Sequence, residues 1–561
     1  MIILRTGRFA IRQQKLLTDL VSPRQPKPWL QPLHLESSFF ITSIRLFSRT
    51  TVNFVSYKTQ KMTTHRGLVL GVYDPIKEDV SKCGEADIVG TPAFQDFNTK
   101  FKGALGKTLI NTGYFNGKMK RGKVRIFHGV DDAYTTIVVV GLGSKQAGVN
   151  ELEQWDEGRE NVRVAAAAAI RQLQEISCTE AELDTFGDDE AAAEGSFLQM
   201  YSFDELKHPD KRKQAISLRP LEKSRNGEWD SGVLLAEGQN YVRTLMETPS
   251  NLKLPPVLAE RIAKDLSSVP NLTVTIRDEQ WAEQKGMGAL LSVSHGSSVP
   301  ARLLEISYKG CGGDDYHAIV VGKGITFDTG GISLKPAANM DLMRGDMGGA
   351  ACTAGALLTV AKLKLPINLL GLLPIAENMP GSTATRPGDV VRAMNGKTIQ
   401  IDNTDAEGRL ILADALCYAQ EFKSKFIVDL ATLTGAIRIA LGGAAAGVFT
   451  NNTKAWQLML QSSIRTGDRV WRMPLFKTYA DKMTDCHLAD INNIGGAGLG
   501  GSCTAAGFLS EFIKKDTKWM HMDIAGVSEN KEEVPYLRKG FTGRPLRTLV
   551  QFVQQLEKET L

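Results

Sequence analysis

Short apolar segments, rich in β-branched residues, alternate with helical segments along most of this chain. The strand-like segments span residues 67–73, 124–127, 136–140, 273–276, 303–307, 318–321, 367–374 and 426–430. Helical patterns lie between them, for example at 158–176, 350–363 and 410–422. Alternation of this kind favours a largely parallel sheet that is covered by helices. The sequence therefore predicts an α/β fold in which a mixed, mostly parallel sheet is flanked by helices.

The length of 561 residues favours more than one domain. We expect a basic leader at 1–62, a smaller N-terminal α/β domain at 63–230, a linker helix at 231–250 and a larger C-terminal catalytic domain at 251–561. The charged, turn-rich stretch 207–229 is expected to be an exposed loop.

Most of the positive charge lies in the leader. Residues 1–62 contain ten Lys or Arg and two acidic residues, whereas the remainder contains 57 basic and 60 acidic residues. The leader is rich in Arg, Ser and Thr, and its Arg45-Leu-Phe-Ser segment resembles a mitochondrial processing site, so a mitochondrial transit peptide is one prediction. Translation from Met62 would instead give a cytoplasmic protein. The acidic body does not predict a nucleic-acid partner.

Cysteine content and hydropathy narrow the class of protein further. The seven cysteines are scattered and odd in number, without metal-type spacing, which favours free thiols in a reducing compartment. No apolar run approaches 18 residues, so no membrane segment is predicted.

Two carboxylates and a guanidinium lie within five residues in Asn403-Thr-Asp-Ala-Glu-Gly-Arg-Leu410. Asp405 and Glu407 are hard oxygen donors of the kind that bind divalent cations, and Arg409 could hold an anion. They also directly precede an apolar helical run. Capping of that helix by acidic residues is therefore an alternative interpretation of this segment alone.

Two further glycine-rich segments carry carboxylates. The segment that follows the strand-like run 317–321 contains Lys323, Asp328 and Lys335, and the turn before residue 350 contains Asp346. Ligand sites in α/β proteins usually lie where strands end. Three such loops, each with Asp or Glu, favour a metal centre.

Three common ligand motifs do not match. Gly322-Lys323-Gly324 lacks the hydroxyl residue of a phosphate-binding loop. The run that ends at Gly143 has Gln146 in place of the third glycine of a dinucleotide fingerprint. A calcium EF-hand beginning at Asp402 would need glycine at its sixth position, where Glu407 stands.

The segments VGKGITFDTGG, MRGDMGGAA and NTDAEGRLILADAL closely resemble the leucyl aminopeptidase (cytosol aminopeptidase) family of two-metal exopeptidases. The resemblance continues through DLATLTGA, GDRVWRMPLF and VPYLRKGFTGRPLRTL, and covers the chain from about residue 62 onward. It implies an enzyme that hydrolyses the N-terminal residue, leucine or a similar one, from peptides. The nucleophile would be a hydroxide that bridges the two metals, and a homohexamer is implied.

The resemblance also implies a role for each site residue. The ligands of two divalent ions (Zn²⁺, Mn²⁺ or Mg²⁺) per subunit would be Lys323, Asp328, Asp346, Asp405 and Glu407. Lys335 and Arg409 match the catalytic residues, and a bicarbonate at Arg409 would be the general base. A lysine ligates only as a neutral amine, so the pKa of Lys323 would have to be lowered, as two adjacent dications would do.

Two further sets of residues follow from the resemblance. An additional metal site is implied at Leu245, Met246, Thr248 and Arg344, although Pro249 makes an ordinary helix end an alternative. The substrate pocket is implied at Ser333, Met343, Thr432, Leu433, Gly435 and Ala525. Ser528 replaces a methionine of the mammalian enzymes, which bears on the preferred N-terminal residue.

Three other functions are alternatives to the peptidase. The same site could serve a dipeptidase for Cys-Gly and its conjugates. A low-activity structural paralogue would be expected to lose ligands, but all seven central residues are present. A nucleic-acid-binding role is disfavoured by the acidic body.

Overall fold

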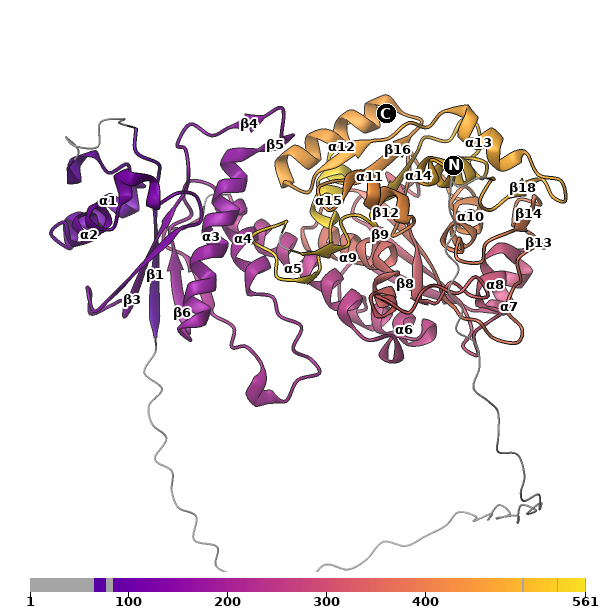
Figure 1. Cartoon of the computed structure of the whole chain (residues 1–561), viewed down its shortest axis with the longest axis horizontal. Coiled ribbons are helices and arrows are strands. Elements are labelled where there is room, and N and C mark those ends of the chain that lie inside the picture. Colours follow the sequence, from indigo (N-terminus) through magenta and orange to yellow (C-terminus); the bar gives the residue numbers. More distant parts are fainter. Residues whose placement is uncertain (1–64, 77–83, 225, 497–498, 532, 560–561) are drawn as a thin grey trace, which may run out of the picture. The chain divides into compact units, whose positions relative to one another are not determined.

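The computed structural model describes residues 65–76, 84–224, 226–496, 499–531 and 533–559 (Figure 1). The predicted leader, its processing site and Met62 lie outside the described residues. Two main sheets, each with helices packed against it, account for most of the described chain, which confirms the predicted α/β class. In this part of the chain, no helix combines the length and apolar character needed to cross a bilayer.

The smaller sheet has the strand order β2-β3-β1-β6-β7 and is parallel except for β2. Alternate residues of β1 enter two different cores, because side chains alternate between the faces of a strand. Val69 packs with helices α3 and α4, whereas Leu68 and Leu70 pack with α1 and α2. The bounds are β1 (Arg66–Val72), β2 (Val124–His128), β3 (Thr136–Gly141), β6 (Glu180–Leu183), β7 (Ser217–Pro220), α1 (Pro92–Lys100), α2 (Ala104–Asn111), α3 (Glu157–Glu175) and α4 (Asp189–Met200).

Strand β7 lies within the stretch 207–229 that was predicted to be an exposed loop, and α5 begins at Glu228 with Trp229 buried, so that prediction was wrong for residues 217–220 and 228–229. The segment Ser-Leu-Arg-Pro pairs only with β6, at the edge of the sheet, and its side chains stay partly or fully exposed. Such an edge strand lacks the apolar run by which the buried strands were identified.

The larger sheet has the strand order β17-β16-β19-β15-β10-β12-β9-β8, and β11 also pairs with β12. The central strands β19, β15, β10 and β12 are parallel, and antiparallel strands β16 and β9 flank them. The bounds are β8 (Leu272–Arg277), β9 (Arg302–Lys309), β10 (Ala318–Gly322), β11 (Gly324–Asp328), β12 (Asn368–Asn378), β15 (Ile427–Ala431), β16 (Ala446–Thr450), β17 (Val470–Arg472) and β19 (Trp519–Asp523).

Helices cover both faces of this larger sheet. Val320 of β10 points into one core, and its neighbours Ile319 and Val321 point into the other. The first core contains residues of α5 (Glu228–Glu247), α6 (Pro255–Leu266), α9 (Gly348–Lys362), α12 (Thr453–Thr466) and α15 (Leu546–Gln555). The second contains residues of α8 (Gly288–Ser294), α10 (Gly408–Ala419) and α14 (Gly501–Ser510).

Helix α5 occupies the region where a linker helix was expected, and it contacts both α4 and α9. The exact domain boundaries remain predictions.

A buried ionic network joins α3 and α4 to the catalytic region. Arg547 of α15 is fully buried, and its guanidinium lies 2.8 Å from Glu194 Oε2 of α4 and 2.9 Å from Asp468 Oδ1. Arg163 of α3 reaches the same Glu194 oxygen at 2.5 Å. Buried charges of this kind need partners, so each side of the network depends on the other.

Candidate metal centre

Lys323 separates β10 from β11 at the edge of the sheet where the parallel strands end. Only the strand before it had been predicted; the glycine-rich stretch after it forms β11 and is not a loop up to Asp328. The buried Lys323 ammonium lies 2.7 Å from Asp346 Oδ2 and 2.9 Å from Glu407 Oε1. A Cβ on Gly408 would stand 2.6 Å from Lys323 Cε, so the residue after Glu407 must be glycine for this approach.

Lys335 brings a second ammonium group to the same cluster. Its Nζ lies 2.8 Å from Asp328 Oδ2 and also contacts Asp405 Oδ1. The loop between Asp328 and Lys335 turns back at Gly330, which has a φ of 87°, a conformation that favours glycine. The backbone N–H of Lys335 donates to Thr329 O at 2.9 Å, which closes the turn.

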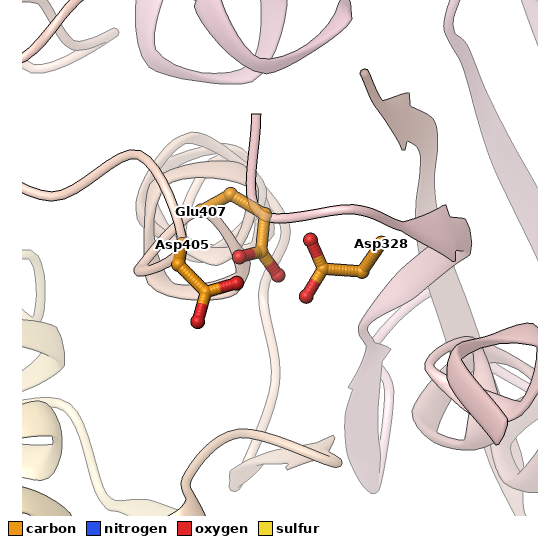
Figure 2. A group of neighbouring side chains, drawn as sticks. All are labelled: Asp328, Asp405 and Glu407. Carbon is orange, nitrogen blue, oxygen red and sulfur yellow. The ribbon is translucent and has the colours of Figure 1, made fainter. Parts of the chain in front are cut away.

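Three carboxylates point toward one another (Figure 2). Oxygen atoms of Asp328, Asp405 and Glu407 lie within 4.8 Å of each other. Glu407 is only 2% exposed, and its Oε2 has no hydrogen-bond partner among the described residues. Asp346 contributes a fourth carboxylate, which contacts the Lys323 ammonium.

The cluster contains more acidic groups than positively charged ones, and the pKa values of its carboxyl groups reflect this. Burial, together with the charge of Asp328, raises the pKa of Glu407 to about 8 and that of Asp346 to about 6. The same two causes raise the pKa of Asp405. Four acids thus face only two ammonium groups, and hard oxygen donors with excess negative charge suit divalent cations. The residues present therefore fit a metal centre.

The pKa of Lys323 is raised, whereas ligation of a metal requires it to be lowered. Burial lowers the pKa of this lysine, but the charges of Asp346 and Glu407 outweigh burial and raise it overall. The expected lowering would have to come from bound dications, which compete with the ammonium for the same carboxylates.

Arg409 lies in the first turn of α10 and is 7% exposed. Its Nη1 donates to Asn493 O at 2.7 Å, and its buried Nε has no hydrogen-bond partner among the described residues. Burial lowers its pKa to about 10, still well above neutrality. A charged, incompletely paired guanidinium beside the cluster suits an anion.

Capping of helix α10 was the alternative interpretation of Asp405 and Glu407. Glu407 occupies the N-cap position of α10, but its side chain makes no capping hydrogen bond. Its oxygens face Lys323 and the other carboxylates instead. The capping interpretation is therefore wrong for Glu407.

Comparisons with known proteins agree with this geometry. Residues 240–550 match the model described as "Cytosol aminopeptidase family, catalytic domain", and residues 69–210 match the N-terminal domain of the same family. The chain belongs to the cytosol aminopeptidase family. This confirms the predicted resemblance, and with it the enzyme class of metal-dependent aminopeptidases.

Individual members of the family align over nearly their whole length. The cytosol aminopeptidase of Homo sapiens is 51% identical over 90% of this chain and 95% of its own, and that of Dictyostelium discoideum is 41% identical over 90% and 96%. Among solved structures, the bottromycin maturation enzyme BotP in complex with Mn has a TM-score of 0.74 at 29% identity, and covers 88% of this chain and all of its own.

A cavity of about 390 Å³ opens onto the cluster. All seven central residues line it, and so do five of the six residues predicted for the substrate pocket, namely Met343, Thr432, Leu433, Gly435 and Ala525. Ser528 also lines it. Ser333, the sixth, is not among the lining residues: its Oγ accepts from Thr404 N at 3.2 Å, which ties the Lys335 loop to the Asp405 loop.

The four residues predicted for an additional metal site are engaged with other groups. The carbonyl oxygens of Leu245 and Met246 accept hydrogen bonds from Lys253 Nζ. Thr248 Oγ1 donates to Thr244 O at 2.7 Å, and Arg344 Nη2 lies 3.0 Å from Glu247 Oε2.

Two positioning residues were missed from the sequence. Asn378 donates to Asp328 Oδ1 at 2.8 Å and so orients that carboxylate. Asp523 accepts from the N–H groups of Leu433 and Ala525, both at 3.2 Å, and thereby holds two segments of the pocket wall. Both are the last residues of strands in the larger sheet. Polar residues at strand ends, the signal that identified Asp328, could have found Asn378, whereas Asp523 ends a strand that was itself missed.

Proposed function

We propose that this chain is a two-metal aminopeptidase that removes the N-terminal residue, leucine or a similar one, from peptides. The observation that carries the proposal is the convergence of three carboxylates at the wall of a cavity: Asp328 from the end of β11, and Asp405 and Glu407 from the segment before α10. Membership of the cytosol aminopeptidase family supports the same reaction.

Five side chains would hold the two divalent ions: Lys323, Asp328, Asp346, Asp405 and Glu407. When bound, the metals supply an acidified water molecule and polarise the peptide carbonyl. Asp328 and Glu407 are the most deeply buried of the four carboxylates, each 2% exposed, so both are well placed to hold metal. The metals would also coordinate the free amino group of a peptide, a group that an internal peptide segment does not offer.

Lys335 and Arg409 would act directly on the reaction. The Lys335 ammonium is held at the carboxylates by Asp328, and from there it can stabilise the negative charge that develops on the carbonyl oxygen. Arg409 has donor capacity left, so it can hold an anion such as bicarbonate as the general base. No histidine is among the described residues that line the cavity, so another group must accept the proton, and the family resemblance implies such an anion.

Metal removal tests the proposal. Hydrolysis of leucine-p-nitroanilide by the purified protein should disappear after complete chelation and return when Mn²⁺, Zn²⁺ or Mg²⁺ is added. Cys-Gly, assayed in parallel, distinguishes the dipeptidase alternative by its relative kcat/KM. Full turnover by protein that has been shown to be metal-free would contradict the proposal.

Assembly and location are further parts of the proposal. A homohexamer is supported by the family resemblance. A mitochondrial location is supported by the basic leader, and a cytoplasmic one by the family-like start at Met62.

A further inference from the structure

Lys253 is a buried cation that the proposed reaction does not use. It follows the short helix at Ser250–Leu252, and only 1% of it is exposed. Its Nζ donates to Leu245 O at 2.8 Å and to Met246 O at 2.9 Å. Lysine is almost never this buried without partners.

The two acceptors are carbonyls in the last turn of α5. Such carbonyls lack partners within the helix, and the negative end of the helix dipole favours a cation beside them. A metal ion bound through backbone oxygens would be stabilised by the same carbonyls and the same end of the helix dipole. Lys253 supplies the charge from within the chain.

The surroundings leave little negative charge for a second cation. Glu247, also in the last turn, is paired with Arg344 at 3.0 Å, and it accepts from Phe541 N at 2.8 Å. Arg261 adds a further positive group where it donates to Thr248 Oγ1 at 3.1 Å. Divalent metals bind oxygen at about 2.0–2.6 Å, so an ion on the same two carbonyls would lie within about 5.5 Å of the Lys253 ammonium. Two like charges that close, away from water, repel strongly.

We propose that the Lys253 side chain takes the place of a third cation, so that each subunit binds two metal ions and no ion at Leu245, Met246, Thr248 and Arg344. The end of α5 is then fixed by a covalently attached group and does not depend on metal concentration. This assignment goes beyond the proposed reaction, because none of these residues belongs to the lysine–carboxylate cluster.

Metal counting tests this assignment. The full-length protein is saturated with Mn²⁺, freed of excess ion by gel filtration, and analysed for Mn per subunit. We expect two ions in the wild type and three in Lys253→Met, which shortens the side chain by one atom and frees both carbonyls. Lys253→Arg, which retains a cation, and Lys362→Met, an exposed control paired with Glu237, should both hold two.

Two results would overturn the assignment: a third ion in the wild type, or a folded Lys253→Met that binds no more Mn²⁺ than the wild type. If Lys253→Met does not fold, the counts for the wild type and for Lys253→Arg decide. Failure of the proposed function would appear differently, as a wild type that binds no Mn²⁺. The difference of one ion between the variant and the wild type would still test Lys253.

Discussion

Glu407→Gln should lower kcat/KM for leucine-p-nitroanilide at least about a thousandfold, which corresponds to about 4 kcal/mol of lost transition-state stabilisation. The substitution keeps the shape of a side chain that is 2% exposed but removes the charge that would hold metal. Burial and Asp328 already raise the pKa of Glu407, so the neutral amide should not disturb folding. The unfolding temperature of the metal-free variant should therefore stay close to that of the metal-free wild type.

The matched control is Glu421→Gln, the same chemical change at an exposed residue that pairs with Lys285. It should retain wild-type rates and metal content. If Glu407→Gln also kept near-normal rates with bound metal, the carboxylate would have no part in the reaction, and the account of the cluster would be wrong.

Arg547→Met should destabilise the protein by about 3–5 kcal/mol, because two buried carboxylates would each lose a cationic partner, Glu194 keeping only Arg163 and Asp468 only Arg544. Glu194 and Asp468 would both lose an ion pair, and Gln239 would lose a hydrogen bond of 2.8 Å from Arg547 Nε. The change should appear as a clearly lower midpoint in urea. It should also appear as faster proteolysis in the exposed stretch 205–215, once α3 and α4 separate more readily from α15.

Arg386→Met provides the comparison for this network. Arg386 is exposed and forms an ion pair with Asp389 at 3.2 Å on the surface, and such surface changes are usually worth within about 0.5 kcal/mol. Equal urea midpoints for Arg547→Met and Arg386→Met would show that the network contributes no net stability.

Much of the fold could be predicted because the central strands consist of β-branched, apolar residues. Residues 318–321 and 426–430 match β10 and β15 to within one residue at each end. Strand β19 was missed because Trp-Met-His-Met-Asp places polar residues in a fully buried strand. His521 is tolerated there because its Nδ1 lies 2.6 Å from Asp429 Oδ1 on the neighbouring strand. Such a pairing between strands cannot be read from local periodicity.

The central site was accessible from the sequence for a different reason. Carboxylates in glycine-rich loops at strand and helix ends are visible as local patterns, and they identified Asp328, Asp346, Asp405 and Glu407. Lys253 carries no such signal. Its burial depends on the carbonyls at the end of α5, and a single lysine before Leu-Pro-Pro is indistinguishable from a solvent-exposed one.

Anomalous X-ray diffraction from Mn²⁺-loaded crystals can show whether the five proposed ligands hold two metal ions. We expect two anomalous peaks per subunit, both within bonding distance of the group formed by Lys323, Asp328, Asp346, Asp405 and Glu407. A single peak, or peaks away from these carboxylates, would contradict the account.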